Sequence, residues 1–127
     1  MAEAFLSSFD SSLEVVSAGT RAAHHVHPGA IQVMSEVGLD LRNHFPKTVD
    51  QFLSQEFDYV ITVCDNAKES CPVFVGSVKH RLHIGFDDPA EAVGGEEEVL
   101  AVFRRVRDEI KRDFYRFYKE LTKKESL

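Results

Sequence analysis

Two cysteines, Cys64 and Cys71, are the side chains of this sequence with the widest chemistry, because a thiolate can act as nucleophile, metal ligand or half of a disulfide. Six residues separate them, too many for the tight turn of a Cys-x-x-Cys redox site. A polar loop of that length can still bring two Cα atoms within the roughly 6 Å that a disulfide requires. From the residues alone, three interpretations stay open: two inert core thiols, half of a metal site, or a redox pair.

A zinc site would need further ligands, for which His80 and His83 are candidates. The spacing of these histidines from the cysteines matches no usual structural zinc pattern. On a strand, two residues three positions apart also point to opposite faces. We therefore predict no metal and no other cofactor.

Asp88 precedes Pro89 just past a predicted strand, which is a stiff position for a carboxyl group. A general acid needs such a fixed and partly dehydrated place, because burial raises a carboxyl pKa towards the working pH. The alternative is an ordinary turn, in which Asp is favoured before Pro. The residues at this point allow both interpretations.

The elements that must position these residues alternate along the chain. Hydrophobic periodicity and turn residues predict helices over 1–9, 28–37, 49–53 and 96–124, and strands over 13–18, 57–64 and 81–85. Residues 57–64 form a nearly continuous apolar run, so we expect this strand to be covered on both faces. The alternation predicts an α/β domain with a parallel sheet wrapped by helices, in which ligands bind beyond the carboxyl ends of the strands.

Length and composition describe one domain that spans residues 1–127. The chain is 43% apolar and carries a net charge of −6, which argues against a nucleic-acid backbone as partner. No apolar run approaches the roughly 18 residues of a membrane span, and Glu3 stands where a secretion signal would carry positive charge. We predict a cytoplasmic protein with no nucleic-acid and no membrane partner.

Five stretches, in order along the whole chain, resemble the thioredoxin-coupled arsenate reductases, which share the low-molecular-weight protein tyrosine phosphatase fold. They are Met-Ala-Glu-Ala-Phe at 1–5, Ser-Ala-Gly-Thr at 17–20, residues 57–67 with Cys71-Pro72, Gly-Phe-Asp-Asp-Pro-Ala at 85–90, and Val-Phe-Arg-Arg-Val-Arg-Asp-Glu-Ile at 102–110. The Cys-x6-Cys segment joined to an Asp-Pro loop separates this family from the phosphatases proper, which lack the cysteine pair.

The resemblance implies reduction of arsenate to arsenite by a series of thiols. In that family, a cysteine of an N-terminal Cys-x5-Arg-Ser phosphate loop attacks the oxyanion, and a second cysteine attacks the first sulfur and releases arsenite. A third cysteine then carries the disulfide to the surface, where thioredoxin reduces it. By position, Cys64 matches the second cysteine, Cys71 the third and Asp88 the general acid. The implied partners are thioredoxin and arsenate or a phosphate-like oxyanion.

The sequence departs from the family at its start. In the family, Met-Ala-Glu directly follows the phosphate loop, so the first strand, the loop and the nucleophilic cysteine are expected to be missing from these 127 residues. In the family's sheet order, 2-1-3-4, that strand lies between the strands at 13–18 and 57–64. We therefore predict a three-layer, doubly wound parallel sheet without its central strand, whose gap closes or is filled by a second copy of the chain or a strand-donating partner.

Three functional hypotheses follow. The chain is an arsenate reductase whose sequence continues upstream of an internal methionine, or a short redox or regulatory binding protein, or a phosphatase-like protein with incidental cysteines. For the 127 residues as given, we expect neither arsenate reduction nor phosphomonoester hydrolysis, because the nucleophile is absent.

Overall fold

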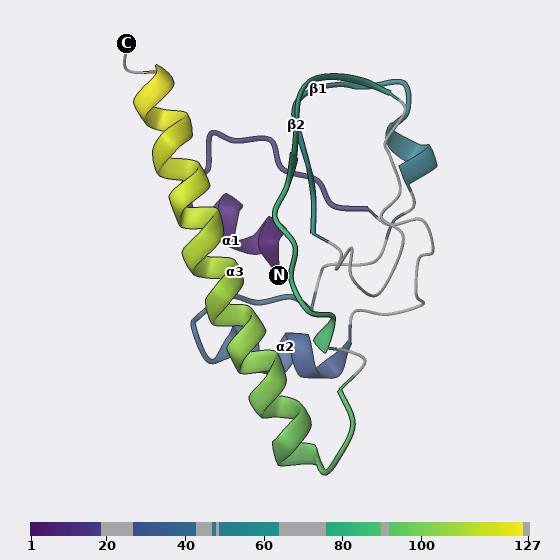
Figure 1. Cartoon of the computed structure of the whole chain (residues 1–127), viewed down its shortest axis with the longest axis vertical. Coiled ribbons are helices and arrows are strands. Elements are labelled where there is room, and N and C mark those ends of the chain that lie inside the picture. Colours follow the sequence, from purple (N-terminus) through teal and green to yellow (C-terminus); the bar gives the residue numbers. More distant parts are fainter. Residues whose placement is uncertain (19–26, 43–46, 48, 64–75, 90–91, 126–127) are drawn as a thin grey trace.

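The computed structural model describes residues 1–18, 27–42, 47, 49–63, 76–89 and 92–125 (Figure 1). These ranges hold the helices α1 (Ala2–Phe9), α2 (Pro28–Ser35) and α3 (Glu96–Glu125), the 3-10 helix η1 (Val49–Phe52), and the strands β1 (Glu56–Thr62) and β2 (Ser77–His83). Helix α3 runs along one side of the molecule, and both α1 and α2 pack against it. No helix within the described ranges is long and apolar enough to cross a membrane.

An apolar stripe along α3 provides the centre of the core. Its side chains recur every three or four residues, as the sequence predicts, and those of Phe103, Val106, Ile110 and Phe114 are buried. Phe5 of α1 lies in the same buried cluster. Each side chain of this size stabilises the fold by about 1.5–3 kcal/mol when it leaves water. The helix predicted over residues 96–124 is therefore confirmed, and it extends to Glu125.

Helices α2 and α3 approach closely at Gly29. A Cβ atom there would lie 2.9 Å from a ring carbon of Phe103, which no ordinary side chain contact allows. The ring of His27 lies 4.7 Å from that of Phe103, and its Nδ1 accepts a hydrogen bond of 2.9 Å from the Gly29 amide. His27 thus caps the start of α2 and packs on α3 at the same time.

The end of α2 leaves no carbonyl without a donor. Gln32 O accepts from the amide of Glu36, Met34 O from that of Leu39, and Ser35 O from that of Gly38. Gly38 has φ of +83°, so the chain turns through the left-handed conformation that glycine adopts easily. The remaining carbonyl, Val33 O, accepts from Arg107 of α3 at 2.9 Å.

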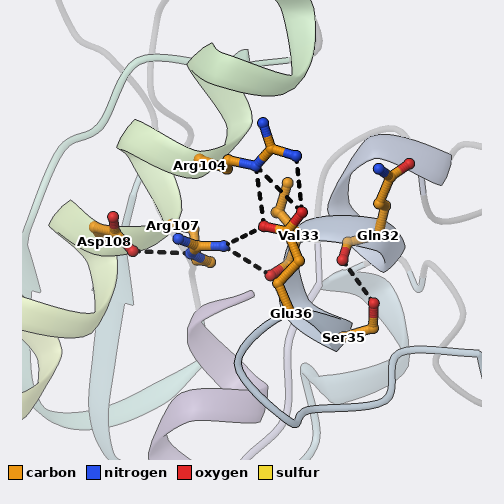
Figure 2. A network of polar contacts seen from close by, with 7 residues as sticks. All are labelled: Gln32, Val33, Ser35, Glu36, Arg104, Arg107 and Asp108. Carbon is orange, nitrogen blue, oxygen red and sulfur yellow. Dashed lines mark hydrogen bonds and ion pairs between the residues drawn. The ribbon is translucent and has the colours of Figure 1, made fainter. Parts of the chain in front are cut away.

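Figure 2 shows the polar network that surrounds this last contact. Glu36 accepts hydrogen bonds from Arg104 at 2.8 and 3.0 Å and from Arg107 at 2.9 Å. Arg107 also contacts Asp108 at 2.8 Å, and its side chain is only 11% exposed. The hydrogen bond from Arg104, more than any other cause, holds the pKa of Glu36 below its usual value. The network therefore fixes the end of α2 on α3.

Strands β1 and β2 form a parallel pair, with Tyr59 opposite His80 and Thr62 opposite His83. This confirms the parallel α/β arrangement, although β2 begins at Ser77 rather than at residue 81. The prediction that β1 is covered on both faces is wrong for its described residues, because none of its side chains is fully buried. The side chains of β1 alternate between partly buried and exposed along its first half, as in a strand with one solvated face.

The predicted strand over residues 13–18 is not observed, and this segment is irregular. A strand requires ladder hydrogen bonds to a neighbour, and within the described ranges β1 and β2 pair with each other. Instead, the Ser17 hydroxyl donates to the Glu3 carboxylate at the start of α1. The sheet in the described ranges is thus two-stranded, and the absence of a central strand stays a prediction.

Candidate functional site

The site forms where both strands end. Beyond β2, Ile84 N donates to Thr62 O at 2.9 Å, and Phe86 N donates to Val63 O at 3.1 Å. In a regular parallel ladder, acceptors on one strand are two residues apart, as are the donors on the other. Here the acceptors Thr62 and Val63 are adjacent while the donors Ile84 and Phe86 are two apart, so the β2 side has one extra residue, as in a β-bulge. This arrangement lays the Asp-Asp-Pro segment beside the carboxyl end of β1, where ligands bind in parallel sheets.

Phe86 attaches that segment to the core. Its side chain is buried, and its ring stacks on Phe114 of α3 with 6.1 Å between the ring centroids. The neighbouring Ile84 also packs against the buried cluster. The residues that follow Phe86 therefore leave the core from a fixed point.

Asp87 is the first polar residue after this point, and it contacts α3 through Arg105. Arg105 Nη2 donates to Asp87 Oδ2 at 2.9 Å, and its Nη1 donates to Glu109 Oε2 at 3.0 Å. The hydrogen bond to Asp87, followed by that to Glu109, raises the pKa of the Arg105 guanidinium. A positive charge thus bridges the loop and the helix.

Asp88, the predicted general acid, is exposed. Its backbone lies in the segment between Phe86 and Pro89, whose carbonyl accepts a hydrogen bond of 3.1 Å from Ala92 N. The expected partial dehydration of its carboxyl group is not observed, because the chain has already left the core at Phe86. The expected stiffness of its position is supported by the contacts on both sides.

Cys64 and Cys71 lie outside the described residues. Cys64 is the next residue in the sequence after Val63, whose carbonyl accepts the hydrogen bond from Phe86. Of the site predicted from the sequence, the structure therefore describes Asp88 and Val63, the residue that precedes Cys64.

His80 and His83 have separate partners. The ring of His80 stacks on Tyr59 at 4.9 Å, and His83 Nδ1 lies 2.7 Å from the Thr62 hydroxyl. Within the described ranges, no group of three or more His, Cys, Asp or Glu side chains is arranged to hold a metal ion. The histidines thus contribute to strand pairing in the described part of the site.

Sequence reasoning missed Arg105 and Glu109. Their spacing of four residues on a predicted helix is typical of an ordinary surface ion pair. The signal that singles them out is the third partner, Asp87, which lies 18 residues earlier and is brought near only by the fold.

Comparisons with known proteins identify the family of the chain. The sequence model of the family described as low molecular weight phosphotyrosine protein phosphatase matches residues 1–127. The chain therefore belongs to this family.

Similar proteins in the family are arsenate reductases by name. That of Halalkalibacterium halodurans is 50% identical over 97 residues, which cover 76% of this chain and 68% of the relative. That of Bacillus subtilis is 46% identical with the same coverage.

A solved structure of an arsenate reductase in the reduced state matches with a TM-score of 0.74 and 26% identity, covering 94% of this chain and 86% of that one. A structure in the oxidized state matches with a TM-score of 0.71 and 27% identity, covering 89% and 81%.

Proposed function

We propose that this chain is part of an arsenate reductase in which Cys64 and Cys71 carry the disulfide and Asp88 is the general acid. The observation that carries the proposal is the hydrogen bond from Phe86 N to Val63 O, because it brings the Asp-Pro loop beside the residue that precedes Cys64. The names of the relatives support the same activity.

The proposed chemistry begins on a cysteine of a phosphate loop. Its thiolate bonds to the arsenic of arsenate, and Asp88 gives a proton to the oxygen that leaves as water. The Cys64 thiolate then attacks that first sulfur: a disulfide forms, the sulfur–arsenic bond breaks, and its electron pair reduces As(V) to As(III), which leaves as arsenite. The Cys71 thiolate attacks Cys64 next, so the bond from Cys64 to the first cysteine breaks and that cysteine leaves as a thiolate. The dithiol of thioredoxin reduces the resulting Cys64–Cys71 disulfide and is itself oxidised to a disulfide.

The 127 residues contain no Cys-x5-Arg sequence, since the residue six positions after each cysteine is a serine, Ser70 or Ser77. We therefore propose that these residues alone do not reduce arsenate. The first cysteine would come from a segment outside them, which supplies a strand on the edge of β1 that faces away from β2. That segment belongs to the same chain or to a strand-donating partner, because a second copy of these residues would lack the same cysteine.

The redox pair is tested with the 127-residue chain itself. After mild oxidation, the chain should consume one equivalent of NADPH in the presence of thioredoxin and thioredoxin reductase. Cys64→Ser and Cys71→Ser should each abolish this consumption. Mass spectrometry that finds two free thiols after oxidation would contradict the proposed pair.

The arsenate chemistry is tested by a chimera that joins a first strand and a Cys-x5-Arg-Ser loop from an arsenate reductase relative to residue 1. The chimera should oxidise NADPH in an arsenate-dependent manner, whereas the 127-residue chain should not. Arsenite release by the shorter chain would overturn its proposed inactivity. A chimera that hydrolyses a phosphomonoester but does not reduce arsenate would favour the phosphatase hypothesis.

A further inference from the structure

A charged contact joins the loop that carries Asp88 to helix α3. This contact is the Arg105 guanidinium, which joins Asp87 in the loop to Glu109 on α3. Asp87 immediately precedes Asp88, so a constraint on the first side chain limits where the second can point.

We propose that Arg105 is a positioning residue for Asp88, an inference that rests on the proposed function. Phe86 fixes the loop on its N-terminal side, and on the other side Pro89 O accepts a hydrogen bond from Ala92 N. Between them, the ion pair with Arg105 restrains the side chain of Asp87.

The geometry of the contact suits this role. Arg105 uses one terminal nitrogen for Asp87 and the other for Glu109, and its planar fork holds both carboxylates at once. Glu109 lies one helical turn beyond Arg105, so the guanidinium is oriented from a rigid element. The side chains of Arg105 and Asp87 are 48% and 45% exposed, which limits the expected effect to a few-fold.

Amide hydrogen exchange of the 127-residue chain tests the restraint directly. Arg105→Gln should speed exchange of the Phe86 and Ala92 amides by about two- to fivefold, the range that a half-exposed ion pair supports. Arg105→Lys keeps the charge and should restore part of the protection. Unchanged exchange in Arg105→Gln would overturn the proposal.

The matched control is Arg112→Gln. Arg112 lies on the same helix, and its ion pair within the described ranges is with the neighbouring Asp113, at 3.0 Å. It should leave the Phe86 and Ala92 amides unchanged. Slow exchange of Ile110 in every variant verifies that α3 remains folded.

The catalytic consequence is measured in the chimera that carries the phosphate loop. Arg105→Gln should lower kcat by about two- to fivefold, in line with the loosened loop, and leave the KM for arsenate unchanged because the anion is bound elsewhere. Arg105→Lys should recover part of kcat. A change in KM alone, or faster exchange with an unchanged kcat, would overturn the positioning role. An inactive unmutated chimera would instead contradict the proposed function, and exchange would still decide whether Arg105 restrains the loop.

Discussion

The two halves of the described molecule differ in how their residues are held. On the side of α1, α2 and α3, the apolar side chains of the core are at most 9% exposed. Arg107 is only 11% exposed and lies among polar partners. At the ends of β1 and β2, Asp88 is exposed and Val63 is 42% exposed. The helical half thus depends on packing throughout, whereas the strand ends are anchored by the buried ring of Phe86 and otherwise held by hydrogen bonds and an ion pair between exposed or half-exposed side chains.

The substitution with the largest expected effect on stability is Phe103→Ala in the helical half. Phe103 is 1% exposed and packs against α2, so the loss of its ring should destabilise the fold by about 3–5 kcal/mol. Chemical denaturation measures the change. Val93→Ala, at a side chain that is 88% exposed, is the control and should stay within about 0.5 kcal/mol. If Phe103→Ala lowered the free energy of unfolding by less than about 1 kcal/mol, the idea that the helical half depends on packing would be wrong.

A pH series tests the polar contact between α2 and α3. Since the pKa of Glu36 is lowered in the folded state, its contribution to stability is present above the unfolded value of about 4.3 and is lost as the pH falls through the folded pKa. Glu36→Gln should therefore reduce the fall in Tm between about pH 5 and pH 3. Glu120→Gln is the control at the other end of α3. Parallel Tm curves for the wild type and Glu36→Gln would count against the role of the network.

The smallest expected change in stability is that of Asp88→Asn at the strand ends. Because Asp88 is exposed, the substitution should alter the free energy of unfolding by no more than about 0.5 kcal/mol. In the chimera, the same substitution should lower kcat by about 100-fold or more, the usual contribution of a general acid. A stability loss comparable to that of Phe103→Ala would remove the contrast between the two halves.

Local patterns predicted the helical half well. The stripe of α3 and the turn at Gly38 are visible within short windows, because helix periodicity and capping depend on residues close in sequence. The irregular segment 13–18 was predicted as a strand, since its β-branched residues indicate extended backbone without showing whether a neighbour pairs with it.

The site shows the same limit. The Asp-Pro step and the strand before it identified the loop of Asp88, whereas the exposure of its carboxyl group depends on where Phe86 enters the core. Arg105 was missed because its partner Asp87 is distant in sequence. Contacts of this kind follow from the folded arrangement rather than from any spacing along the chain.

The hydrogen bond from Arg107 to Val33 O has a consequence for the order of folding. Helix α2 has eight residues, fewer than the roughly 12–15 at which an isolated helix becomes even marginally stable in water. Within the described part of the chain, the donor to one of its last carbonyls is a side chain from α3, more than 70 residues later. Newly synthesised α2 must therefore wait, largely unstructured, until most of the chain has been made and α3 can dock against it.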